Sequence, residues 1–140
     1  MCVKSFTLVT EDMGEVEAWK VFEQWEKDEV FTWCMGKHRR RYGYPINEWM
    51  NEADDRRPCF RNDETTELGR PFGFMAFKEK DHADVFLKHN TDAGVLRKVK
   101  LRGIRAIGTE EVHEYGPTSS KASLFPCYIA REMLILPEEA

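Results

Sequence analysis

The sequence predicts an α+β domain, in which a mainly antiparallel, twisted sheet of about five or six strands carries one principal helix at about residues 80–90. Three observations predict this class. A strand pattern, a helix pattern and a longer strand pattern follow one another between residues 72 and 108. Alternating apolar residues recur near both ends of the chain. The 140 residues are 41% hydrophobic, which suits one folded domain spanning 1–140.

The first predicted strand covers residues 2–10. Cys2, Phe6 and Leu8 lie on one side of an alternating pattern, with hydroxyl side chains on the other. The strand is expected to end at the acidic turn 11–14, which contains a glycine.

Residues 16–35 fit two patterns. As a helix, Val16, Trp19, Phe22 and Trp25 would form an apolar stripe, but acidic residues would then occupy its continuation. As strands, the same segment offers aromatic and β-branched residues on both sides of a polar turn at 26–29. We therefore predict a hairpin.

The middle of the chain is expected to be irregular. Residues 36–45 predict a loop because glycine, proline and basic residues are frequent there. Residues 46–50 are compatible with a short strand or with one helical turn. The polar segment 51–71 predicts the longest loop of the domain, a length that is often functional in compact proteins.

Residues 72–77 are apolar on both faces, which predicts a central strand. Asp81 can cap the helix that follows, because its carboxylate can accept an amide hydrogen bond and favours the positive end of the helix dipole. Ala83, Phe86 and Leu87 have the spacing of one buried helix face.

The next strand is predicted from residue 95 to 108, with Val99 and Leu101 facing inward and a bulge at Gly103. A turn at 115–120 and a closing strand at 123–136 complete the domain. On the outer face of the 95–108 strand we expect Lys98, Lys100 and Arg102.

Charge is segregated along a chain whose net charge is −4. Residues 1–35 are acidic, whereas the segments 37–41 and 97–105 are basic. Net acidity argues against an indiscriminate nucleic-acid coat, but both basic segments could contact phosphate or an acidic partner. In the first of them Tyr42 adds an aromatic face of the kind that stacks on bases. The candidate binding residues are Lys37, Arg39, Arg40, Arg41, Tyr42, Lys98, Lys100 and Arg102.

Other site classes lack their sequence patterns. Cys34 and His38 could form half of a zinc site, but Cys59, Cys127 and His113 supply no second close pair, so no metal site is predicted. Cys34 and Cys127 are expected to be core residues. No catalytic constellation, phosphate-binding loop or dinucleotide fingerprint is present, so no catalytic residue and no cofactor are predicted. Neither a membrane-spanning apolar run nor an export signal is found, which favours a cytoplasmic protein that does not contact a membrane.

The strand block 73–78, the residues Ala83 and Phe86, the segment 99–103 and the late segment 130–133 together resemble a set of small phage and prophage proteins. In those proteins a Gly-Phe-x-Ala-Phe-Lys strand leads into an Asp-Ala helix, a Val-x-Val-x-Gly strand and a final Ala-Arg-Glu-Met strand. The resemblance covers most of residues 16–136. It implies a fold and a phage setting, with the host cytoplasm as the location, and it implies no activity.

A weaker similarity connects the glycine–aromatic strand and its helix to ADP-ribosyltransferase-like domains. Those enzymes use an early Arg or His that grips nicotinamide and a late catalytic Glu. Here Lys20 stands where the early residue is expected, which departs from the pattern. The late candidates are Glu110, Glu111 and Glu132.

Three functions follow from these observations. The first is a non-enzymatic phage-type protein that binds a host or phage protein through its charge patches, with a surface tryptophan such as Trp49 as an anchor. The second is a divergent ADP-ribosyltransferase-like enzyme. The third is a nucleic-acid binder that uses segments 37–41 and 97–105.

Overall fold

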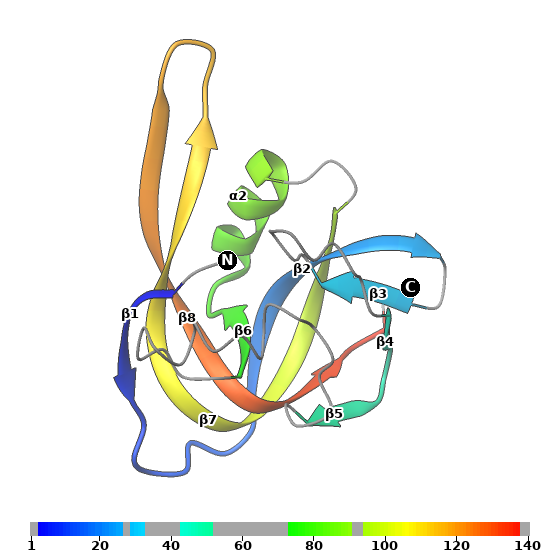
Figure 1. The fold of residues 1–140 in the computed structure, drawn as a ribbon. Coiled ribbons are helices and arrows are strands. Elements are labelled where there is room, and N and C mark those ends of the chain that lie inside the picture. The colour runs from blue at the N-terminus through cyan, green and yellow to red at the C-terminus, as the bar shows by residue number, and fades with distance from the viewer. Residues whose placement is uncertain (1–2, 27–28, 33–42, 52–72, 91–93, 138–140) are drawn as a thin grey trace, which may run out of the picture.

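The computed structural model describes residues 3–26, 29–32, 43–51, 73–90 and 94–137 (Figure 1). These residues form one antiparallel sheet and one helix, which confirms the predicted α+β class. The strands are β1 (Val3–Leu8), β2 (Val16–Glu26), β3 (Glu29–Thr32), β4 (Gly43–Pro45), β5 (Trp49–Asn51), β6 (Phe74–Phe77), β7 (Gly94–Tyr115) and β8 (Ser120–Ile135), and the helix is α2 (Lys80–Asn90).

The sheet contains eight strands rather than five or six, because short segments of the predicted irregular region also pair. β4 lies within the predicted loop 36–45 and pairs with β3. Its Tyr44 is buried and meets the ring of Phe74 edge-on, with 6.4 Å between centroids. Burial of this aromatic side chain explains why the segment is ordered as a strand. β5 follows a turn at Asn47, whose φ is 64°, and pairs with β8.

The hairpin predicted for residues 16–35 is confirmed over the described part of that range. β2 and β3 are antiparallel, and Glu26 is in register with Glu29. The alternation of β2 also explains its two-sided apolar pattern. Ala18 and Phe22 are fully buried on one face, whereas Trp19 and Val21 lie against the helix side.

The sheet closes on itself through its longest strand. Along the path β1-β7-β8-β6-β2-β3-β4 each strand pairs with the next, and β2 pairs additionally with β7. Strands β7, β8, β6 and β2 therefore form a ring of antiparallel pairs. The seam between β2 and β6 is narrow, because Trp19 and Phe77 are its one registered pair among the described residues.

The predicted bulge in β7 is confirmed. Gly103 has a φ of 67°, and the register with β8 shifts between Ile104 and Ala106. Before the bulge Val99 and Leu101 are fully buried, as predicted, and beyond it the buried positions are Ala106 and alternate residues up to Val112. The bulge thus allows one strand of 22 residues to bend while its apolar face stays inside.

The helix α2 agrees with the prediction for residues 80–90, and Asp81 lies in its first turn. Its inner face, Ala83 and Phe86, packs against Val21, Phe77 and Val112. Figure 1 shows the helix resting beside the upper part of the β7–β8 pair. Within the described ranges, no helix combines the length and apolar composition that a membrane crossing requires.

Candidate functional site

The β7 bulge brings arginine side chains from two strands together. Arg102 of β7 is opposite Glu132 of β8, and Ile104 is opposite Ala130, so Gly103 lies across from Arg131. A Cβ added to Gly103 would lie 3.1 Å from the Arg131 Cβ. The absence of a side chain at Gly103 therefore leaves room for the aliphatic stem of Arg131.

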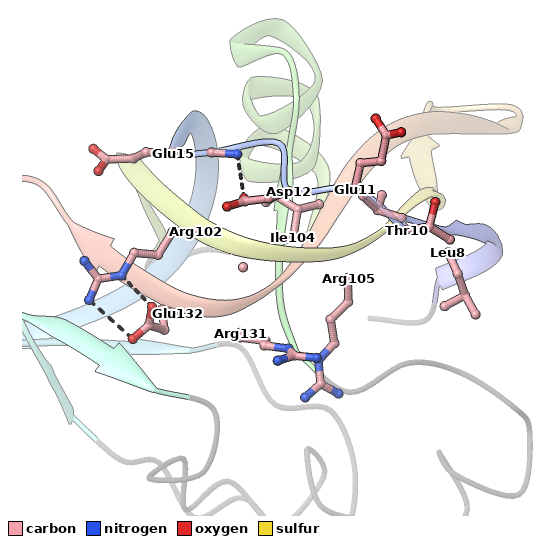
Figure 2. A pocket seen from close by; sticks show the side chains of 13 residues that line it. Leu8, Thr10, Glu11, Asp12, Glu15, Arg102, Ile104, Arg105, Arg131 and Glu132 are labelled. Carbon is pink, nitrogen blue, oxygen red and sulfur yellow. Dashed lines mark hydrogen bonds and ion pairs between the residues drawn. The ribbon is translucent and has the colours of Figure 1, made fainter.

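The segment between β1 and β2 forms the second wall of a groove at this bulge. Val9 N–H donates to the Arg105 carbonyl over 2.7 Å, which ties the segment to β7. Gly14 N–H donates to Asp12 Oδ1 over 2.8 Å, which closes a turn. The groove has a volume of about 840 Å³ (Figure 2). It is lined by Leu8, Val9, Thr10, Glu11, Asp12, Gly14, Glu15, Arg102, Gly103, Ile104, Arg105, Arg131 and Glu132.

Arg102 is held in the groove by an acidic partner and by an aromatic ring. Its Nε and one terminal nitrogen donate to the two Glu132 oxygens, over 2.5 Å and 3.3 Å. Its guanidinium carbon also lies 3.9 Å from the centroid of the Trp49 ring. The hydrogen bond from Arg102 lowers the pKa of Glu132, and the same bond raises the pKa of Arg102. Arg102 and Trp49 therefore contact each other within the chain, and neither side chain is fully available to bind a partner.

Arg131 is exposed, and no hydrogen bond or ion pair joins it to another part of the described chain. Arg105 is partly buried and is held by contacts of its own. Both side chains project to the same side of the β7–β8 pair (Figure 2). Glu11 and Asp12, both exposed, lie on the opposite wall. The groove therefore offers guanidinium donors on one wall and carboxylates on the other.

The predicted stripe Lys98, Lys100 and Arg102 does point outward, but each member has an acidic partner. Lys98 Nζ lies 3.1 Å from Glu17 Oε2, and Lys100 Nζ lies 3.4 Å from Glu15 Oε1. Arg102 pairs with Glu132. The pairing of β2 with β7 brings Glu15 and Glu17 alongside the lysines, and the pairing of β8 with β7 brings Glu132 alongside Arg102. The charges of the stripe are therefore largely neutralised. The other candidates, Lys37, Arg39, Arg40, Arg41 and Tyr42, lie outside the described residues.

Arg97 belongs to the basic segment 97–105 but does not lie on the surface. Only 6% of Arg97 is exposed, and its position is directly opposite Lys20, which is 3% exposed. Residue 97 shares the inward parity of Val99 and Leu101, so the strand alternation itself buries it. Arg97 is therefore part of the interior and not of a binding surface.

Lys20 and the late glutamates have structural partners in this fold. Lys20 Nζ donates to the Met75 carbonyl at the seam between β2 and β6. Glu110 is 2% exposed. Glu111 Oε1 lies 3.1 Å from His113 Nε2, and Glu132 pairs with Arg102. Glu111 and Glu132 are thus partly accessible at separate places on the surface, and Lys20 and Glu110 are interior.

Cys127 is fully buried, as predicted for a core cysteine. The pKa of its thiol is raised from 9.0 to about 12, mainly by burial and also by the nearby Glu110 charge, whereas the Lys20 charge opposes the rise. Lys20, Glu110 and Cys127 therefore share one interior region. Among the described residues, no group of three or more His, Cys, Asp or Glu side chains could hold a metal ion.

The buried thiol should be unreactive, and its ionisation should weaken the fold in alkali. Above about pH 9 the unfolded chain loses the Cys127 proton while the folded chain keeps it, so stability falls as pH rises from 9 toward 12. We expect the native protein and the Cys127→Ala variant to give equal counts of reacting thiols in a dithionitrobenzoate assay. After unfolding, the variant should count one fewer. If the folded variant already gave a lower count than the folded parent, Cys127 would be accessible to the reagent and therefore not buried.

Arg105 and Arg131 line the groove but are not among the binding residues that the sequence predicts. In the sequence Arg105 belongs to a basic segment and Arg131 to the Ala-Arg-Glu-Met motif. The available signal was Gly103, because a bulge glycine often accommodates a neighbouring side chain. The partner strand could not be identified from that signal alone.

Comparison with protein-family models, with curated proteins and with solved structures gives no match for this chain. The resemblances to phage proteins and to ADP-ribosyltransferase-like domains therefore stay predictions.

Proposed function

We propose that this chain is a small, phage-type, non-enzymatic protein that binds a host or phage protein in the groove between residues 8–15 and the β7 bulge. The observation that carries the proposal is the position of the Arg131 side chain. Its stem lies against Gly103, and its guanidinium is exposed without an internal partner in the described chain. A guanidinium positioned in this way can bind a carboxylate in bidentate geometry at little entropic cost.

The composition of the groove favours a protein partner over a nucleic acid. Glu11 and Asp12 add negative charge to the lining of the groove, which would repel a phosphate backbone. Leu8 is 62% exposed on the rim, and Met13 close by is 40% exposed, so apolar contacts are also available. Arginine and apolar side chains surrounded by charge are typical of protein interfaces.

A charge reversal at Arg131 tests this proposal. A photo-crosslinking residue at Thr10, on the groove wall, should label one predominant protein in host or phage lysate. Arg131→Glu should reduce that label at least tenfold, because a like charge then opposes the partner's carboxylate. The exposed position predicts that the fold survives the substitution.

The matched control is Lys88→Glu, which makes the same charge change on the exposed side of α2. It should leave the label unchanged. Equal losses from the two reversals would indicate a general effect of net charge, and an absence of any labelled protein would count against the groove as a protein-binding site.

A further inference from the structure

The end of the β7–β8 pair projects from the rest of the fold as a two-stranded arm, formed by residues 111–115 and 120–125 (Figure 1). β1 leaves β7 at Glu110, and β6 joins β8 only from Cys127 onward. In the described chain, the two strands of the arm therefore pair with each other and with no third strand.

One face of the arm is fixed by the helix. Val112 is 1% exposed and packs with Phe86, and His82 stacks on Phe125 with 4.1 Å between ring centroids and 2° between planes. The arm is therefore held in a defined orientation before any partner arrives, which lowers the entropic cost of binding.

The two edges of the arm differ. On the β7 edge, the Tyr115 N–H is directed away from β8 and donates to His89 Nδ1 of the helix over 3.3 Å. On the β8 edge, the Pro126 carbonyl accepts the Lys78 N–H over 3.2 Å. Backbone groups on a strand alternate in direction, so those of Ser120, Ala122 and Leu124 face the same edge as the Pro126 carbonyl. The helix thus blocks the β7 edge, and the open stretch on β8 is residues 120–124.

This open stretch has little of the usual protection of an edge strand. Lys121 is its one charged residue, and residues 120–124 contain no proline. Its outer face carries Leu124, which is 59% exposed, and across the ribbon lies Tyr115, which is 61% exposed. Such an edge is a template for an added strand.

We infer that the added strand is the same stretch of a second copy of this chain, paired antiparallel about a two-fold axis through Ala122. In this register Ala122 is opposite its own equivalent, and each Ser120 is opposite Leu124 of the other copy. These are the residues whose backbone groups face outward, so all three pairs exchange hydrogen bonds.

The side chains are self-complementary in this register. Each Leu124 meets a small serine, beyond which Tyr115 of the other copy adds apolar surface. Lys121 is opposite Ser123 of the other copy, so no like charges face each other. On its own ribbon Lys121 has Glu114 as its cross-strand neighbour. The pairing extends the sheet across the dimer as β7-β8-β8-β7, an isologous arrangement.

Cysteine scanning tests the register. A hydrogen-bonded antiparallel pair has Cα atoms about 5.5 Å apart, within the range of a disulfide. Ala122→Cys should therefore form an intermolecular disulfide under mild oxidation, mapped by mass spectrometry to residue 122 in both chains. Lys121→Cys is the control and should not pair with itself, because its equivalent lies two residues out of register and faces Ser123. Equal crosslinking at both positions would reflect random collision and would overturn the proposed pairing.

Sedimentation of the full chain tests the dimer itself. The parent should shift from monomer toward dimer as its concentration rises, and Ala122→Pro should stay monomeric, because it removes an outward N–H that the β7–β8 ladder does not use. Ala122→Val keeps that N–H and should still dimerise. Circular dichroism of the proline variant should match the parent. If the parent sediments as a monomer at all concentrations, the inferred dimer is refuted. The groove proposal would be unaffected by that result, because Arg131 lies outside the arm.

Discussion

Replacing Lys20 by methionine is expected to lower the free energy of unfolding by about 3–5 kcal/mol, the usual cost of removing one member of a buried charged group. Methionine fills similar space, so the loss arises from chemistry rather than from a cavity. The Met75 carbonyl loses the donor that serves it at the seam, and the interior loses a positive charge near Glu110 and Cys127. Urea unfolding followed by tryptophan fluorescence measures the change.

Lys98→Met is the matched control. Lys98 is on the neighbouring strand, with a side chain 32% exposed and an ion pair to Glu17 at the surface. Such a pair contributes about 0–1 kcal/mol, so this control should stay within that range. The double variant Lys20→Met with Glu110→Gln should lose less than the sum of the single losses, because each single change leaves the other charge uncompensated. Strict additivity would show that the two groups do not interact.

Gly73→Ala is expected to destabilise the domain by about 2–5 kcal/mol, through backbone strain and overpacking together. Gly73 precedes β6 and has a φ of 152°, a backbone conformation that residues with a side chain rarely adopt. A Cβ there would lie 2.7 Å from the Ala130 carbonyl oxygen and 2.7 Å from Ile129 Cγ2. Because one obstacle is backbone, β6 would have to move away from β8. Thermal unfolding should show the loss as a lower Tm.

Gly14→Ala separates strain from contact. Gly14 has a φ of 71°, but nothing lies within 4 Å of the position of its Cβ. Only the conformational cost of about 1–2 kcal/mol applies there. If the two glycine variants lost the same stability, the close approach of Gly73 to β8 would carry no energetic weight.

The fold was largely predictable because its strongest signals are local. The apolar alternation of β7, the helix stripe ending at Leu87 and the turn at 115–120 each depend on neighbouring residues. The hairpin of β2 and β3 was recognised because acidic residues interrupt the helical stripe after Trp25. β4 was missed because only the burial of Tyr44 against Phe74, a contact distant in sequence, identifies it.

The candidate site was less predictable because it depends on register between distant strands. The outward direction of Lys98 and Lys100 follows from alternation. Their partners are Glu17 of β2 and Glu15 just before it, and nothing local assigns the pairing of β2 with β7. Arg97 could have been predicted as buried, since it shares the parity of Val99. Arg131 could not, because its position over Gly103 exists only once β7 and β8 are aligned.

The central place of β7 has a consequence for how the chain folds. In the described structure β1 pairs with β7 alone, and β2 closes the ring by pairing with β7. Neither early strand can form these pairs until β7, which is synthesised much later, is available. Because the N-terminus leaves the ribosome first, the apolar strands β1 and β2 are exposed before their partner strand has been synthesised. Such sequence-distant pairing predicts slow folding compared with helical domains of this size. During that interval β2, with Ala18 and Phe22 uncovered, is the segment most in need of chaperone protection.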